Sequence, residues 1–283
     1  MWNGVISRAE LEMNGFGRRQ ISDLMANGDL QRISKGWYAW RNADPEVVLA
    51  AAANARLGCL SACRYHGLWV PEEKPSAVHV LASASESAAR IKDRIRWASR
   101  GTVTPIVHRA CGDKQILVEG LAEALEHVAR FHNSELALIA LESALNLERV
   151  STHWIEWMVS QLPVHRARQL TDIQPLSQSG SETRVAHFLR NRGLPVIQQF
   201  SPLPGMRVDM CVGSSWILEC DSHAHHASID AFESDRTRDL ALKEAGFDVT
   251  RLSYWQIWHD WDNTKKALVK MANRRRYMRR RPR

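Results

Sequence analysis

The sequence lacks the features that would place it in a membrane or outside the cell. No run approaches the 18 consecutive apolar residues that a membrane-spanning helix needs. The first residues, MWNGVISRAE, do not combine a basic start with an apolar core, so we predict no signal peptide. The cysteines are odd in number, follow no zinc-ribbon spacing and are interpreted as reduced, which favours a cytoplasmic protein with no membrane partner. These five are Cys59, Cys63, Cys111, Cys211 and Cys220.

Acidic residues are absent from residues 274–283, RRRYMRRRPR, which hold seven arginines. Removing those seven from the 38 lysines and arginines leaves 31 basic against 31 acidic residues, so the rest of the chain is formally neutral. An arginine-rich tail is expected to bind a polyanion such as DNA, although a solvated end without a partner is the alternative. With only Tyr277 and Met278 to bury, the tail should add little stability. Its first candidates for phosphate contacts are Arg274, Arg275 and Arg276.

Residues 1–42 are predicted to form a winged-helix DNA-binding domain. Ser7 and Glu10 fit a capping box, a second helix is expected over residues 18–26, and a hairpin should turn at Gly36. Helix, turn, helix and hairpin are the order of a winged helix, whose second helix contacts DNA. The candidate DNA contacts are Arg18, Arg19, Arg32 and Lys35. Ordinary surface charges on a small protein-binding module are the alternative.

Within this segment, residues 28–38 read GDLQRISKGWY. This run resembles the wing of the N-terminal antitoxin domain of the AbiEi family. The resemblance covers about 40 residues in all and implies DNA binding, and it does not by itself imply a toxin partner.

Residues 45–175 are predicted to form an α/β middle domain that resembles the middle of AbiEi-like proteins. We expect helices at 45–69 (with a break), 118–131, 135–147 and 151–162, strands at 77–83 and 102–110, and a linker at 171–181. No catalytic constellation is predicted in this region. Cys59 and Cys63, four residues apart, are interpreted as small buried hydrophobic residues rather than half of a metal site. The pair His108 and Arg109 is interpreted as structural.

Residues 176–273 show the pattern of a helix, a three-strand meander, a helix and a fourth strand, with a tight turn at Gly213 and Ser214. This is the core order of the restriction-endonuclease-like fold. The chain as a whole is therefore expected to be α/β, or mixed α+β.

Carboxylates in this region suggest a site for a divalent cation. Asp209 and Glu219 fall on adjacent predicted strands, and their oxygens suit Mg²⁺ or Mn²⁺. Glu182 falls on the buried stripe of the preceding helix, where an acid needs a metal, a metal-bound water or an arginine as partner. Such an ion polarises a phosphoryl oxygen and activates water. Acids that hold a metal beside a basic tail that holds phosphate point to a nuclease.

The run ECDSHAHH, followed by DRTRDLALKEAGF and VTRL, resembles a subgroup of the PD-(D/E)XK superfamily related to very-short-patch-repair endonucleases. Asp209 and Glu219 match the first two motif positions, whereas Asp221 stands at the usual lysine and Ser222 replaces a glycine. The resemblance implies that Asp209 and Glu219 ligate the metal. It implies that Glu182 helps through water, that the Cys220 carbonyl adds a ligand, and that Asp221 ligates a second ion or orients a histidine. His225 or His226 would act as general base or stabilise the leaving oxygen. Arg238 would hold phosphate or pair with Asp235 or Asp239.

These observations predict a Mg²⁺-dependent endodeoxyribonuclease that a winged helix targets to DNA, in phage defence, a toxin–antitoxin system or repair. The alternative is a transcriptional regulator or antitoxin that binds DNA and keeps a catalytically silent nuclease fold. A homodimer and a protein partner both stay open.

Overall fold

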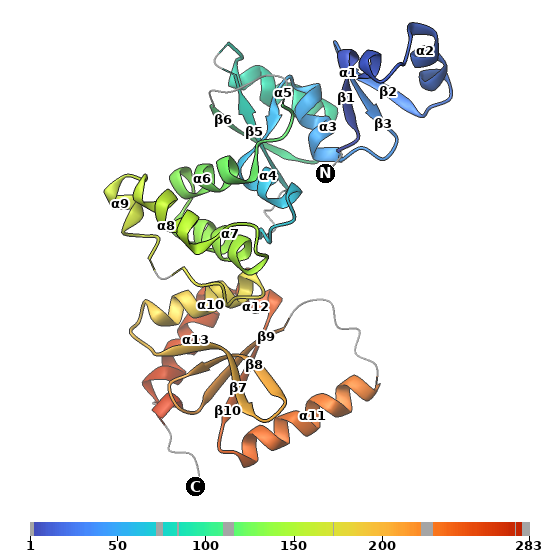
Figure 1. Ribbon diagram of the computed structural model, residues 1–283. Helices are drawn as coiled ribbons and strands as arrows, with labels where there is room; N and C mark the ends of the chain where they lie inside the picture. The colour runs from blue at the N-terminus through green and yellow to red at the C-terminus, as the bar shows by residue number, and fades with distance from the viewer. Residues whose placement is uncertain are drawn as a thin grey trace. The chain divides into compact units, whose positions relative to one another are not determined.

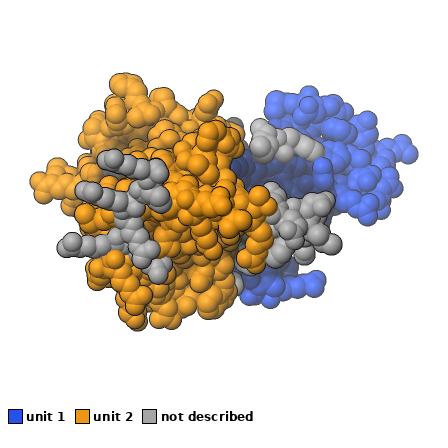
Figure 2. Space-filling model, turned by 90° about the horizontal axis from the view of Figure 1, so that it is seen from below, with its two compact units in different colours: residues 1–136 blue, residues 137–283 orange. Residues whose placement is uncertain are grey.

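The computed structural model describes residues 3–71, 76–83, 85–109, 116–171, 173–221, 229–274 and 276–278, with the backbone alone at 229–235 and 276. Helices and strands are mixed, so the expected α/β class is confirmed (Figure 1). The chain divides into two compact units, residues 1–136 and 137–283, which Figure 2 colours separately. None of the described helices combines the length and apolar character needed to span a bilayer.

Unit 1 contains two small sheets and their helices (Figure 1). Its elements are β1 (Val5–Ser7), α1 (Arg8–Met13), α2 (Arg18–Ala26), β2 (Leu30–Ser34), β3 (Trp37–Trp40), α3 (Pro45–Ala52), β4 (Arg56–Leu57), α4 (Cys59–Tyr65), β5 (Ala77–Ala82), α5 (Ala88–Ala98), β6 (Thr104–Arg109) and α6 (Leu121–Phe131). Helix α7 (Ser134–Asn146) crosses the division between the units.

The first sheet follows the predicted order of two helices and a hairpin. Ser7 and Glu10 form the expected capping box at α1, and the β2–β3 hairpin turns at Gly36, whose φ of 85° suits glycine. Strand β1 was not predicted, and it pairs with β3 to give the order β1-β3-β2. A small core holds this module together and consists of Leu11, Ile21, Leu30 and Tyr38.

The second sheet has the order β4-β5-β6, with β5 and β6 parallel and joined through α5. Helix α5 was not predicted, and β4 lies within residues 45–69, where helices with a break were expected. Helix α5 buries Ile91 and Ile95, four residues apart on one face, against a core that also includes Val5 and Ala39 of the first sheet. The predicted winged-helix segment and the start of the predicted middle domain therefore share one hydrophobic core.

Unit 2 contains one four-stranded sheet with helices around it. Its elements after α7 are α8 (Thr152–Ser160), α9 (Val164–Ala167), α10 (Gly180–Arg190), β7 (Val196–Leu203), β8 (Met206–Val212), β9 (Trp216–Asp221), α11 (Ile229–Glu244), β10 (Asp248–Ser253), α12 (Tyr254–Trp258), α13 (Trp261–Asn273) and the 3₁₀ turn η1 (Arg276–Met278).

The strand order of this sheet is β10-β9-β8-β7, in which β7, β8 and β9 are antiparallel and β10 runs parallel to β9. The predicted succession of helix, three-strand meander, helix and strand is confirmed. Side chains alternate along the strands: Met210 and Leu218 join a core with α10 and α13, whereas Cys211 and Ile217 join a core with Leu242 of α11. Hydrophobic clusters therefore cover both faces of the sheet.

A buried carboxylate fastens α7 to the segment that was predicted to be a linker. Glu142 of α7 accepts hydrogen bonds from Ser177 Oγ at 2.7 Å, Thr183 Oγ1 at 2.8 Å and the Gln174 backbone N–H at 3.1 Å. Burial raises the pKa of Glu142. The division between the compact units accordingly falls before Ala137, and not at the predicted linker.

The start of the arginine tail is docked on unit 2. The Tyr277 carbonyl accepts the Ser214 backbone N–H at 2.8 Å and its hydroxyl at 3.1 Å, at the turn between β8 and β9. The Tyr277 ring packs against the core of that sheet. Tyr277 is thus half-buried at this turn. The expectation that the tail adds little stability stays a prediction.

Candidate functional site

Two of the predicted acids stand together at one end of the β8–β9 hairpin, opposite the turn at Gly213. Asp209 lies on β8 and Glu219 on β9, just beyond the last paired positions of the two strands. Asp209 Oδ2 accepts the backbone N–H of Cys220 at 2.7 Å, which fixes the aspartate against the neighbouring strand. Burial raises the pKa of both carboxyls above their ordinary values. The arrangement concentrates partly desolvated negative charge at one end of the two central strands.

The third predicted acid, Glu182, lies in the first turn of α10 and is 4% exposed, so its expected place on the buried stripe is confirmed. Its carboxylate accepts hydrogen bonds from Ser179 Oγ at 2.9 Å, the Gln178 N–H at 3.0 Å and the Gln199 amide at 2.9 Å. Burial, and then the negative charge of Asp209, raises the pKa of Glu182 to about 7. The charge of Asp209 therefore disfavours the ionised form of Glu182.

Two arginines contact Glu219 from neighbouring elements. Arg238 of α11 lies 2.7 Å from Glu219 Oε1, and Arg251 of β10 lies 3.1 Å from Oε2. The sequence predicted that Arg238 binds phosphate or pairs with Asp235 or Asp239. In the structure it pairs with Glu219. Asp239 pairs instead with Arg251, at 2.9 Å. The carboxylate that was predicted to hold a metal thus carries two cationic partners.

The remaining predicted residues of this site fall into three groups. Asp221 ends β9 in an exposed position. Burial raises the pKa of Asp209, and the negative charge of Asp221 raises it further. The Cys220 side chain packs into the hydrophobic core, as expected for the strand face opposite Glu219. The base candidates His225 and His226 lie outside the described residues. Among the residues that are described, the acids do not bring three ligand atoms within 4.8 Å of one another.

The candidate DNA contacts in unit 1 are all exposed. None of them forms an ion pair with another described residue, so their charges face solvent. These residues are Arg18 and Arg19 at the start of α2, and Arg32 and Lys35 on the β2–β3 hairpin. Of the tail candidates, Arg274 is exposed after α13, Arg276 is described only as backbone, and Arg275 lies outside the described residues.

A basic hollow of about 560 Å³ on α13 was not predicted. Helical spacing brings Lys266 and Lys270, four residues apart, onto one side of α13. Arg192, just after α10, lines the same hollow. The residues that line it are Arg192, Asp262, Lys265, Lys266, Val269 and Lys270. Such a cationic surface is suited to a phosphate backbone.

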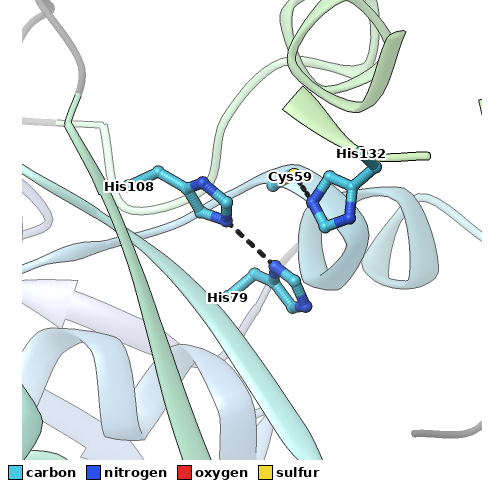
Figure 3. Close-up of side chains that lie close together, drawn as sticks. All are labelled: Cys59, His79, His108 and His132. Carbon is cyan, nitrogen blue, oxygen red and sulfur yellow. Dashed lines mark hydrogen bonds between the residues drawn. The ribbon is translucent and has the colours of Figure 1, made fainter. Parts of the chain in front are cut away.

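Unit 1 holds a second cluster, of one cysteine and three histidines (Figure 3). One ligand atom from each of Cys59, His79, His108 and His132 lies within 4.8 Å of the other three. Cys59 Sγ is 3.0 Å from His132 Nε2, and His79 Nδ1 is 3.0 Å from His108 Nε2. Burial, and then the neighbouring histidines, lowers the pKa of His108 to about 4, which keeps its imidazole neutral.

This cluster was not predicted from the sequence. The expectation that residues 45–175 hold no catalytic constellation stays a prediction. Cys63 is a buried small residue as interpreted, but Cys59 and His108 belong to the cluster. The sequence gives only a weak indication of the cluster, because its first and last residues are 73 positions apart and the four follow no short motif. None of the four described cysteines forms a disulfide, in agreement with the expected reduced state.

A scan against protein-family models and a search of curated proteins found no match to this chain.

Proposed function

We propose that this chain is a metal-dependent DNA endonuclease whose catalytic residues lie in unit 2. The observation that carries the proposal is that Asp209 and Glu219 lie at the same end of the two central strands of the sheet. Glu182 is near enough for the charge of Asp209 to raise its pKa. The resemblance to very-short-patch-repair endonucleases, drawn from the sequence, supports the same reaction. The context of phage defence, a toxin–antitoxin system or repair stays part of this proposal.

The donor set fits a hard divalent cation, Mg²⁺ or Mn²⁺, because it consists of carboxylate oxygens and one backbone carbonyl. Asp209, Glu219 and the Cys220 carbonyl would hold the ion, and Glu182 would act through water. When bound, the ion supplies Lewis-acid polarisation of a phosphoryl oxygen and lowers the pKa of water. Asp221 would serve a second ion or orient a histidine.

Arginines of the site have a second use in this proposal. Arg238 and Arg251 balance Glu219 while no phosphate is bound, and guanidinium groups bind phosphate oxygens in the same bidentate manner as carboxylates. We infer that one of them transfers to the scissile phosphate when DNA binds. His225 or His226 would then act as general base or stabilise the leaving oxygen.

Binding of DNA in this proposal starts from unit 1. The exposed cations Arg18, Arg19, Arg32 and Lys35 would place the protein on its target, and the basic hollow on α13 would hold the backbone near unit 2.

The paired state of Glu219 favours one alternative. Arg238 and Arg251 neutralise the acid Glu219, and Asp221 stands where the motif has lysine. Both features favour a DNA-binding regulator with a silent nuclease fold. Such a protein binds DNA in a salt-sensitive way and leaves it intact.

The experiment is nicking of supercoiled plasmid, with linear and single-stranded DNA in parallel, in Mg²⁺ or Mn²⁺. Asp209→Asn and Glu219→Gln should each lower the rate by at least about 100-fold, because each removes a ligand charge worth several kcal/mol. Glu244→Gln, an exposed acid at the end of α11, is the matched control and should cleave like the parent. Parental rates in both site variants would refute the assignment, and DNA binding without any cleavage would establish the regulator.

A further inference from the structure

We infer that Cys59, His79, His108 and His132 form a closed binding site for Zn²⁺ in unit 1. The inference is independent of the proposed nuclease activity, because it rests on residues of a different unit. Thiolate and imidazole are the ligands that zinc prefers, and four protein ligands without an open position are the mark of a structural zinc site.

The geometry of the cluster is close to that of a zinc tetrahedron. With zinc–nitrogen and zinc–sulfur bonds of normal length, neighbouring ligand atoms in such a site are about 3.3–3.6 Å apart. The two measured contacts, Cys59 to His132 and His79 to His108, are both 3.0 Å, and every other pair lies within 4.8 Å. Small rotations of the side chains therefore suffice to place an ion between them. On binding, the Cys59 thiol would release its proton to solvent and the histidines would bind as neutral imidazoles.

The ligands come from four elements that the fold brings to one place (Figure 3). His79 lies in the middle of β5, and His108 lies on β6 opposite Leu81, so strand alternation puts both imidazoles on one face of the parallel pair. His132 caps the C-terminus of α6, and Cys59 begins α4. An ion here would link the two paired strands to both helices through a single centre.

Cys59 is held toward β5 by its neighbour Gly58. The Gly58 N–H donates to the His79 carbonyl at 3.0 Å, and a Cβ at this glycine would come within 2.4 Å of Leu81. Cys59 itself has a φ of 54°, a left-handed conformation that costs energy for a residue with a side chain. The close approach at Gly58 and the strained backbone at Cys59 together aim the thiol at the histidines.

Glu119 supports the ligands from outside the cluster. Its carboxylate accepts the Cys59 backbone N–H at 2.8 Å and lies 2.5 Å from His127 Nδ1, and the side chain is buried. Outer residues of this kind orient metal ligands, and their loss typically lowers metal affinity 10–100-fold. We therefore assign Glu119 as a positioning residue.

The first test needs no variant. The purified full chain should hold one zinc ion per molecule after dialysis, and zinc-edge X-ray absorption should count one sulfur and three nitrogen ligands. Replacement by Co²⁺ should give the intense visible bands of tetrahedral cobalt with a thiolate charge-transfer band in the near ultraviolet. A chain that retains no metal, or one whose metal has no sulfur ligand, would overturn the inference.

Variants then locate the site. Cys59→Ala and His132→Ala should lose the bound metal and the thiolate band, whereas Cys63→Ala, a buried cysteine four residues away, should keep both. Glu119→Gln should retain the band and bind zinc about 10–100-fold more weakly. The Asp209→Asn and Glu219→Gln variants should keep full zinc content, which separates this site from the proposed nuclease site. Retention of the band in Cys59→Ala would also contradict the assignment.

Discussion

The Cys/His cluster of unit 1 and the acidic site of unit 2 both place candidate metal ligands on paired strands, but the charges around the ligands differ. Cys59 and His132 contact each other directly, and no arginine or lysine stands among the four ligands. Glu219 instead pairs with Arg238 and Arg251. A cluster of neutral ligands can assemble before its ion arrives, whereas clustered carboxylates need counter-charges to fold.

This difference has a functional meaning. Neutral ligands that already converge suit an ion that stays bound and stabilises the fold. Carboxylates held by exchangeable arginine partners suit a site that opens when phosphate and a hard cation arrive together. The two units would therefore use metals for different purposes, one structural and one chemical.

The largest effect should come from metal removal. A strong zinc chelator should destabilise unit 1, because structural zinc contributes binding free energy on the order of 10 kcal/mol in small domains. Hydrogen exchange followed by mass spectrometry should show faster exchange in α4, β5, β6 and α6, and no change in β7 to β10. Equal acceleration in both units would remove the distinction between them.

A smaller effect is expected at the buried carboxylate of α7. Glu142→Ala leaves Ser177, Thr183 and the Gln174 N–H without their acceptor, which should cost about 3 kcal/mol. Denaturant unfolding with exchange measured in unit 2 checks this, and Glu156→Ala, an exposed glutamate on α8, is the matched control. If Glu142→Ala is as stable as the control, α7 is only loosely associated with unit 2.

The double substitution Arg18→Ala with Arg19→Ala tests whether unit 1 selects the DNA. Loss of a bidentate base contact should weaken specific binding by roughly 1–3 kcal/mol, measured by fluorescence anisotropy at fixed salt. Cleavage of a short non-specific duplex at high protein concentration should be spared. Arg41, which follows β3, offers a control substitution to alanine. Unchanged affinity for every DNA would assign the N-terminal module to a protein partner.

The last expected effect is a pH dependence that Glu182 adds to the stability of unit 2. Its pKa of about 7 in the folded state lies above the ordinary value of 4.5, so the folded state binds more protons between these pH values. The free energy of unfolding should therefore fall as pH rises from about 4.5 to 7, by at most about 1.4 kcal/mol per pH unit for this group. Glu182→Gln imitates the protonated acid and should flatten that fall in urea titrations. A slope identical to that of the parent would show that Glu182 ionises normally.

Much of the local structure could be predicted because its signals lie close together in sequence. The capping box at Ser7, the turn at Gly36 and the alternation around Glu219 each depend on residues a few positions apart. The pairing of Glu219 with Arg251 could not be predicted, because it depends on the parallel register of β9 and β10. The Cys59 cluster was missed for the same reason, since its geometry exists only after β5, β6 and α6 have packed.

Tyr277 holds the start of the arginine tail at one end of the β8–β9 hairpin. Its carbonyl sits on the Gly213–Ser214 turn so closely that a side chain at Gly213 would come within 2.3 Å of it. The turn is four residues from Asp209, or about 13 Å along the strand. The start of the tail is therefore held at the far end of the same hairpin that carries the acidic site. A fluorophore attached just after Met278 would report how close bound DNA comes to this end of the hairpin.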